Sequence, residues 1–221
     1  LTGALAFRGV DFAHDGMPSG RRVLSGVDFT LPAGATLAVV GRTGSGKTSL
    51  VQLLPRLFDA TSGTVEIDGR DVRTIPLATL RGAIGFVPQD PFLFSRSVRD
   101  NIRFGAPEAD DAAVQRVAAI AALDRDIEEL PRGYDTIVGE RGITLSGGQK
   151  QRVTLARALI VEPTILVLDD ALSSVDTETE RRILQQLRGV MHERTSILIA
   201  HRVSTVMDAD LILVLDDGRV V

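Results

Sequence analysis

The sequence predicts an α/β fold: a mainly parallel sheet, an antiparallel β subdomain and an inserted α-helical subdomain. Three observations predict it. Short apolar runs of β type alternate with helical stretches up to about residue 94. The pattern is then helical, and strand-like runs return after residue 164. We therefore expect one domain, 1–221, with the core and β subdomain at about 1–94 and 162–221 and the helical subdomain at about 95–161.

The individual elements follow from local periodicity and turn residues. Two early runs alternate partly between apolar and polar residues, and Asp68-Gly69 is a typical hairpin turn. A helix is expected to start near Gly46, with Leu50, Leu53 and Leu54 on one face. The expected strands are 4–14, 23–31, 36–40, 63–67, 83–87, 165–168, 196–200 and 211–215. The later expected helices are 110–123, 149–160 and 178–191.

Composition and charge exclude several classes of function. The net charge is −4, so there is no basic surplus and we expect no nucleic-acid partner. No run approaches the 18 or so apolar residues of a membrane-spanning helix. The absence of cysteine excludes disulfides and thiolate metal sites. Because the sequence starts at Leu1 without Met and stops after a strand-like run, we expect it to be part of something longer.

A glycine-rich loop follows the short apolar run at 36–40 and fits the pattern G-x-x-x-x-G-K-[ST]. Its glycines allow backbone N–H groups to converge on phosphate oxygens, and the helix start behind it favours an anion. Lys47 is expected to reach the β- and γ-phosphates of ATP, and the Thr48 hydroxyl to ligate Mg²⁺. The fold class is therefore a P-loop NTPase core. The residues expected to hold the nucleotide here are Gly41, Arg42, Thr43, Gly44, Ser45, Gly46, Lys47, Thr48 and Ser49.

A second run places acids where a metal site needs them. The apolar run from Ile165 ends in Asp169 and Asp170. An acid at the carboxyl end of a strand in an α/β sheet, beside a P-loop, supplies a negative partner for Mg²⁺. We therefore predict Asp169 as a metal ligand.

A third feature is a second glycine-rich helix start, Leu145-Ser146-Gly147-Gly148-Gln149, whose serine stands 99 residues after Lys47. With these motifs in this order, the whole chain resembles the nucleotide-binding domain of ABC (ATP-binding cassette) transporters. The resemblance implies that 145–149 is the family's signature motif, and Ser146, Gly147, Gly148 and Gln149 are then binding residues. In the family, the serine and the glycine N–H groups of this motif contact the γ-phosphate of ATP held by the opposite subunit. As at the P-loop, a helix N-terminus then faces an anion. The implied partner is a second, homologous ABC ATPase domain.

The resemblance also implies roles for three further side chains. Gln89 matches the Q-loop glutamine, which senses the γ-phosphate and Mg²⁺ near the point where a transmembrane domain docks. Asp176 matches the D-loop residue that crosses the dimer interface, and His201 matches the switch histidine that contacts the γ-phosphate. The segment Thr136–Gly142 is similar to the X-loop of exporter-type ABC proteins, which touches the transmembrane partner. We therefore expect the motor of an exporter at the cytoplasmic face of a membrane.

Two residues depart from the family pattern. Asp170 stands where the family usually has Glu to polarise the attacking water, and the shorter side chain withdraws the acid by roughly 1.5 Å. A misplacement of about 1 Å can cost on the order of 100-fold in rate, so we expect slow hydrolysis at this chain's own P-loop. This pattern resembles heterodimeric exporters with one degenerate site, whose partner carries the catalytic Glu. His14 stands where the family commonly has a Tyr that stacks on adenine, so we expect His14 to bind the nucleotide, with weaker stacking because imidazole offers a smaller face. The alternative is a surface histidine at the end of a strand.

The predicted reaction is phosphoryl transfer from ATP to water, with Lys47, Gln89, Asp170 and His201 as catalytic residues and Thr48, Gln89 and Asp169 at the Mg²⁺. Alternatives remain open. A soluble ABC ATPase of chromosome maintenance or repair would carry a long coiled coil between P-loop and signature, which this sequence lacks. The tandem ABC ATPases of translation carry two cassettes and basic linkers. A regulatory subunit that mainly binds ATP is consistent with Asp170. Whether the dimer is homodimeric or heterodimeric also stays open.

Overall fold

The computed structural model describes residues 1–16, 22–139, 142–199, 206 and 209–221. They form two compact units. Unit one comprises Leu1–Ile84, Thr164–Asp169 and Met191–Val221, and unit two comprises Gly85–Pro163 and Asp170–Val190. Both sheets and several helices are present, so the structure has the predicted α/β fold class. Among the described residues, no helix combines the length and the apolar character that crossing a membrane requires.

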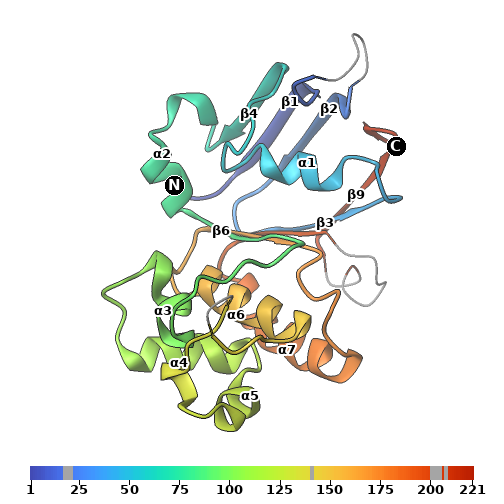
Figure 1. The fold of residues 1–221 in the computed structure, drawn as a ribbon. Coiled ribbons are helices and arrows are strands. Elements are labelled where there is room, and N and C mark those ends of the chain that lie inside the picture. The colour runs from blue at the N-terminus through green and yellow to red at the C-terminus, as the bar shows by residue number, and fades with distance from the viewer. Residues whose placement is uncertain (17–21, 140–141, 200–205, 207–208) are drawn as a thin grey trace. The chain divides into compact units, whose positions relative to one another are not determined.

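An antiparallel sheet occupies the N-terminal part of unit one (Figure 1). Its strand order is β2-β1-β4-β5, with β1 at Leu5–Phe12, β2 at Leu24–Leu31, β4 at Ser62–Ile67 and β5 at Arg70–Asp71. The turn from β4 to β5 uses Asp68 (φ 52°) and Gly69 (φ 72°), the two positive φ values of a type I′ hairpin. The hairpin expected at Asp68-Gly69 is therefore confirmed.

The second sheet of unit one is mainly parallel. Within unit one its strands follow the order β10-β9-β3-β8-β7, in which β3 pairs in parallel with both β8 and β9. Because such strands are covered on both faces, they read as continuous apolar runs, and β3, β7 and β8 are buried almost throughout. The strands are β3 (Thr36–Val40), β7 (Ile165–Asp169), β8 (Thr195–Ile199), β9 (Leu211–Asp216) and β10 (Arg219–Val220). Helices α1 (Lys47–Gln52) and α2 (Leu77–Gly82) and the 3₁₀ turn η1 (Val72–Thr74) complete unit one, and β6 (Ile84–Val87) leads into unit two.

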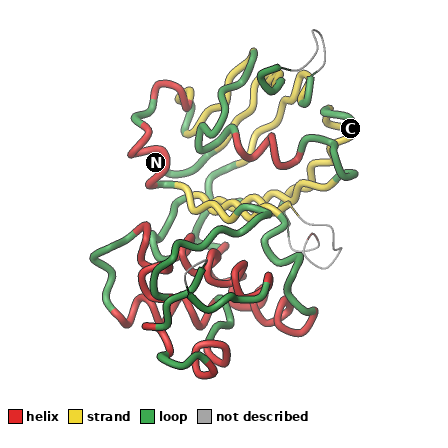
Figure 2. Tube along the Cα trace, in the orientation of Figure 1, coloured by secondary structure: helices red, strands yellow, loops and turns green. Residues whose placement is uncertain are grey.

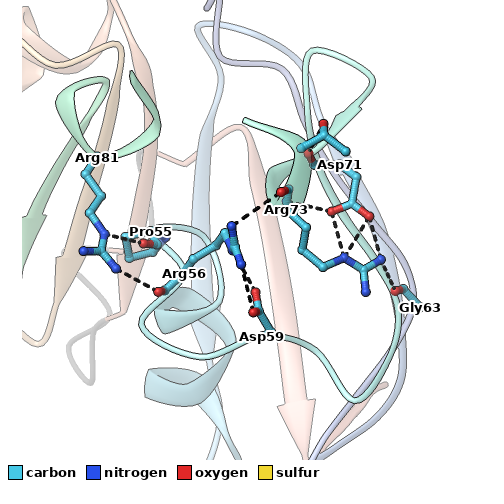
Figure 3. A network of polar contacts seen from close by, with 8 residues as sticks. Pro55, Arg56, Asp59, Gly63, Asp71, Arg73 and Arg81 are labelled. Atoms are coloured by element: carbon cyan, nitrogen blue, oxygen red, sulfur yellow. Dashed lines mark hydrogen bonds and ion pairs between the residues drawn. The ribbon is translucent and has the colours of Figure 1, made fainter. Parts of the chain in front are cut away.

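An ion-pair network fixes the turn that follows α1 (Figure 3). Arg56 adopts a left-handed backbone conformation, with φ 53°. The guanidinium of Arg81 donates to the carbonyls of Pro55 and Arg56, each across 3.0 Å. Arg56 itself donates to both oxygens of Asp59, at 2.8 and 3.0 Å. Arg81 therefore stabilises an otherwise unfavourable turn by binding the two carbonyls it exposes.

Unit two is mostly helix and loop, as Figure 2 shows by colour. Its elements are α3 (Val98–Ile102), η2 (Arg103–Gly105), α4 (Asp111–Ile120), α5 (Asp124–Glu129), η3 (Gly133–Asp135), α6 (Gly147–Leu159) and α7 (Thr177–Met191). The helical character expected for the middle of the chain is confirmed.

Two helix boundaries were predicted wrongly. Leu53 and Leu54 were expected on the first helix, but α1 ends at Gln52, because the Leu54 N–H bonds to the Val51 carbonyl in a tighter turn.

The sequence also favoured a single helix over 110–123, but α4 ends at Ile120 and α5 begins at Asp124. Ala122, with φ 56°, closes the first helix, and the Leu123 N–H bonds back to the Ala118 carbonyl. This is the hydrogen-bond arrangement of a Schellman cap, in which glycine is usual, so the alanine gave no stop signal.

Candidate functional site

The phosphate-binding loop connects β3 to α1 within unit one. Lys47 is the first residue of α1 and is buried. The ammonium donates to two carbonyls of the loop itself, those of Gly41 at 2.8 Å and Arg42 at 2.9 Å. The loop therefore curls around a cation, which is the arrangement that phosphate oxygens require.

Two glycines of the loop are fixed by close backbone contacts. At Gly41 a Cβ would lie 2.1 Å from the Leu215 carbonyl oxygen, and at Gly46 it would lie 2.8 Å from that of Val23. Gly46 also has φ 101°, which L side chains rarely adopt. Between them, the buried Ser45 hydroxyl has no hydrogen-bond partner within the described part of the chain. Arg42, Thr43 and Gly44 are exposed.

The two residues predicted to bind the metal meet inside unit one. The Thr48 hydroxyl donates to Oδ1 of Asp169 across 3.1 Å. Asp169 closes β7 and is 99% buried, whereas Thr48 follows Lys47 on α1. A hydroxyl and a carboxylate are hard oxygen ligands of the kind that Mg²⁺ prefers. The residues present therefore fit a magnesium ion beside the phosphate loop.

His14 lies beside the same loop in unit one. Its Nε2 is 3.5 Å from the Ser49 hydroxyl oxygen. The imidazole makes edge contacts with Phe12, at 4.7 Å between ring centroids, and with Phe58, at 5.0 Å. His14 thus belongs to an aromatic cluster next to α1, and its contact with adenine stays a prediction.

The predicted signature motif is the start of α6 in unit two. Ser146 and Gln149 form a capping box: the Gln149 N–H donates to Oγ of Ser146 at 3.2 Å, and the Ser146 N–H donates to Oε1 of Gln149 at 2.9 Å. Gly147 and Gly148 lie in the first turn of α6, where backbone N–H groups have no acceptor within the helix. Ser146 and Gly147 are exposed. N–H groups in the first turn of a 13-residue helix, with a hydroxyl beside them, are suited to binding an anion.

The loop after Asp170 is attached to this helix start. The buried Gln151 side chain donates to the Ser173 hydroxyl at 3.0 Å and accepts from the Ser174 N–H at 2.9 Å. A Cβ on Gly148 would lie 2.8 Å from the Ser174 carbonyl oxygen, so only glycine allows this approach. Asp170, half-buried, has φ 47°, a conformation that Asp tolerates better than most residues.

Asp176 is exposed and caps α7. A hydrogen bond from the Thr179 backbone N–H, supported by one from Glu178, holds the pKa of Asp176 below its usual value. Its carboxylate is therefore ionised over the physiological range. Its predicted role at a dimer interface remains a prediction.

The remaining predicted residues are placed as follows. Gln89 is exposed in the loop after β6 and belongs to unit two. Thr136 is buried and its hydroxyl accepts from the Arg132 N–H at 3.0 Å, but 140–141 of the segment Thr136–Gly142 lie outside the described residues. His201 also lies outside them. The roles of Gln89, Asp170 and His201 at the phosphates stay predictions.

Sequence reasoning missed the residues that hold the signature helix. Besides Gln151, these are Asp126 on α5 and Arg152 on α6, which bind each other and the end of the motif. Asp126 stands 26 positions before Arg152 in a short helix with several acids. No local pattern distinguishes it from its neighbours.

Comparison with known proteins agrees with this geometry. A family model described as "ABC transporter" matches residues 24–173. The chain is 47% identical over 219 residues to an uncharacterised ABC transporter ATP-binding protein, YknV, of Bacillus subtilis, covering 99% of this chain and 36% of that protein. It is 48% identical to the human mitochondrial potassium channel ATP-binding subunit over 221 residues, which are 100% of this chain and 30% of that protein.

A solved structure described as a bacterial Atm1-family ABC exporter with ATP bound matches with a TM-score of 0.94 and 45% identity, over 99% of this chain and 38% of that one. The chain therefore belongs to the ABC transporter family, as an ATP-binding domain homologous to the ABC exporters. It spans about a third of the length of the relatives it matches.

Proposed function

We propose that this chain is the ATP-hydrolysing motor domain of an ABC exporter, which couples ATP-driven closure of a domain dimer to export across a membrane. The observation that carries the proposal is that one chain holds two separate backbone segments suited to binding phosphate. One is the loop around Lys47 in unit one, and the other is the free start of α6 in unit two. Its relatives include an exporter structure with ATP bound, which supports the assignment.

Each residue predicted at the phosphates has a definable task. The Lys47 ammonium donates to carbonyl oxygens of the loop, and when ATP binds it donates to phosphate oxygens instead. Thr48 and Asp169 hold Mg²⁺, and the Ser45 hydroxyl supplies a further donor. Mg²⁺, when bound, neutralises charge that develops on the phosphates. Gln89 and His201 contact the reacting end, and Asp170 positions the attacking water.

The start of α6 serves ATP held by a second ABC ATPase domain. Its donors are the N–H groups of Gly147 and Gly148 and the Ser146 hydroxyl. Gln149 acts indirectly by capping the helix start, because both polar atoms of its side chain already bond to protein groups. ATP then closes a dimer because the nucleotide is bound from both sides, and hydrolysis opens it.

A transmembrane domain docks at the loop after Gln89 and at Thr136–Gly142, at the cytoplasmic face of the membrane. Phe92 in that loop is 63% exposed, large for an apolar side chain. The loop is nevertheless rigidly held, since Arg157 donates to the Phe92 carbonyl at 2.9 Å and the buried Asn101 binds both backbone groups of Phe94. A rigid loop with an exposed aromatic side chain suits the transmission of movement.

The chain's own site is slow, because Asp170 is shorter than Glu by one methylene group. The partner in the dimer is then a non-identical domain with a catalytic Glu, whose ATP is completed by this chain's signature. Asp170 also favours a second candidate, a regulatory subunit that binds ATP and scarcely hydrolyses it. Turnover measured with and without the partner domain distinguishes the two.

Phosphate release by the purified chain tests the proposal. We expect slow Mg²⁺-dependent ATP hydrolysis that Lys47→Ala abolishes together with ATP binding. Hydrolysis that survives Lys47→Ala, or a chain that binds no ATP, would contradict it.

A further inference from the structure

A mostly buried ion pair lies next to the start of α6. Asp126 and Arg152 have side-chain exposures of only 17% and 13%. Arg152 Nη2 donates to Oδ1 of Asp126 at 2.9 Å, and Nη1 lies 2.8 Å from Oδ2, so the contact is bidentate. Bidentate arginine–carboxylate pairs are among the most directional contacts in proteins.

The same carboxylate also binds the signature motif. Gln149 Nε2 donates to Oδ1 of Asp126 at 2.8 Å, while Oε1 of Gln149 accepts from the Ser146 N–H. Arg152 donates in addition to the Gly148 carbonyl at 3.3 Å and to the Ala122 carbonyl at 2.8 Å. One acid on α5 thereby fixes both the cap and the first turn of α6.

We infer that Asp126 is a positioning residue for the trans ATP site, an inference that rests on the proposed function. By holding Gln149 and Arg152, it keeps the free N–H groups of Gly147 and Gly148 and the Ser146 hydroxyl aimed at the phosphate. It also holds the Gln149 amide back from that phosphate.

Loss of the carboxylate has a physical consequence at the helix end. In Asp126→Ala the Arg152 guanidinium stays in a mostly buried position without its anion, and the Gln149 amide loses its acceptor. Both groups then rearrange, and the first turn of α6 shifts with them. A displacement of about 1 Å costs on the order of 100-fold in rate, so we expect turnover to fall at least about tenfold.

Turnover of the full chain is to be measured for Asp126→Ala, alone and mixed with Lys47→Ala. The Lys47→Ala chain cannot bind ATP in its own loop but keeps an intact signature. We expect Asp126→Ala to bind ATP like the wild type, to turn over slowly alone, and to recover when mixed. A second variant, Asp126→Asn, should show a several-fold loss, because its amide opposes Arg152 Nη1 donor to donor. Glu128→Ala, an exposed acid on α5, is the matched control and should be unchanged.

Recovery in the mixture separates positioning from general damage, because an unfolded chain binds no ATP and cannot be rescued. If Asp126→Ala and Asp126→Asn turn over like the wild type, or stay slow in the mixture while binding ATP, the inference is overturned. The control for the proposed function is Gly147→Val. If that variant also matches the wild type, the two-domain site itself has failed, whereas a slow Gly147→Val beside a normal Asp126→Ala refutes only the role of Asp126.

Discussion

The Thr48 hydroxyl donates a hydrogen bond to Oδ1 of Asp169 across 3.1 Å, joining residues 121 positions apart in the sequence. The contact forms because α1 starts beside the carboxyl end of β7, both within unit one. It places a hydroxyl and a carboxylate where two ligands of one small cation would stand.

Removal of the Thr48 hydroxyl is expected to weaken Mg²⁺-dependent nucleotide binding. Thr48→Val keeps the shape and loses the ligand, so ATP affinity in the presence of Mg²⁺ should fall by about tenfold or more. Affinity measured with EDTA should change little. Thr48→Ser is the matched control and should behave like the wild type. Equal losses with Mg²⁺ and with EDTA would show that Thr48 does not act through the metal.

Lengthening Asp170 is expected to raise ATP turnover. Asp170→Glu restores roughly 1.5 Å of reach, but Glu tolerates the backbone φ of 47° less well than Asp. We therefore expect ATP turnover to rise by about tenfold, which is less than the longer side chain would give without the backbone strain. Asp170→Asn keeps the backbone preference and removes the acid, so turnover should fall about 100-fold. Unchanged or lower turnover in Asp170→Glu would count against the slow-site proposal.

His14→Ala is expected to weaken ATP binding by roughly threefold to tenfold, the size of one aromatic stacking contact. His14→Tyr presents a larger face and should tighten binding. GTP titrations alongside ATP check that the effect comes from the base. If both variants bind ATP with wild-type affinity, the contacts of His14 with Phe12 and Phe58 are purely structural.

Asp68 is expected to contribute stability that is lost in acid. Burial raises the pKa of Asp68, but hydrogen bonds from Thr2, Gly3 and Ala4 together lower it by more. The pKa of Asp68 therefore lies below its ordinary value of 3.8. A carboxyl whose pKa is depressed in the folded state stabilises the fold at pH values above its pKa in the unfolded chain. This stabilisation is lost as the pH falls through its pKa in the folded state.

Urea unfolding at pH 7 and at pH 3 measures this effect. Asp68→Asn tolerates the φ of 52° and keeps one acceptor oxygen, so it should lose about 1–2 kcal/mol at pH 7. The difference from the wild type should shrink at pH 3. A difference that is the same at both pH values would rule out the charge as its source.

The sequence predicted the elements and motifs that have local signals. The loop at Gly41–Thr48 follows a buried strand as expected, and α6 starts at Gly147, two residues before the predicted start, because Ser146 and Gln149 cap each other. The wrong helix boundary at Ala122 shows the limit of such signals, because an alanine in a left-handed cap carries no mark of its conformation.

The contacts that hold the site together could not be predicted, because they join distant segments. Gln151 binds the loop at Ser173 and Ser174, and Asp126 binds Gln149 and Arg152, over separations of 22 to 26 residues. These partners are ordinary polar residues whose pairing depends on how α5, α6 and the loop after Asp170 pack within unit two. Only the structure identifies them.

The dependence of ATP turnover on chain concentration tests the central claim most directly, because a nucleotide bound between two chains requires both. We predict that turnover per chain rises with concentration, and that Gly147→Val removes this rise while leaving ATP affinity of the Lys47 loop intact. Turnover per chain that is independent of concentration and insensitive to Gly147→Val would contradict the claim.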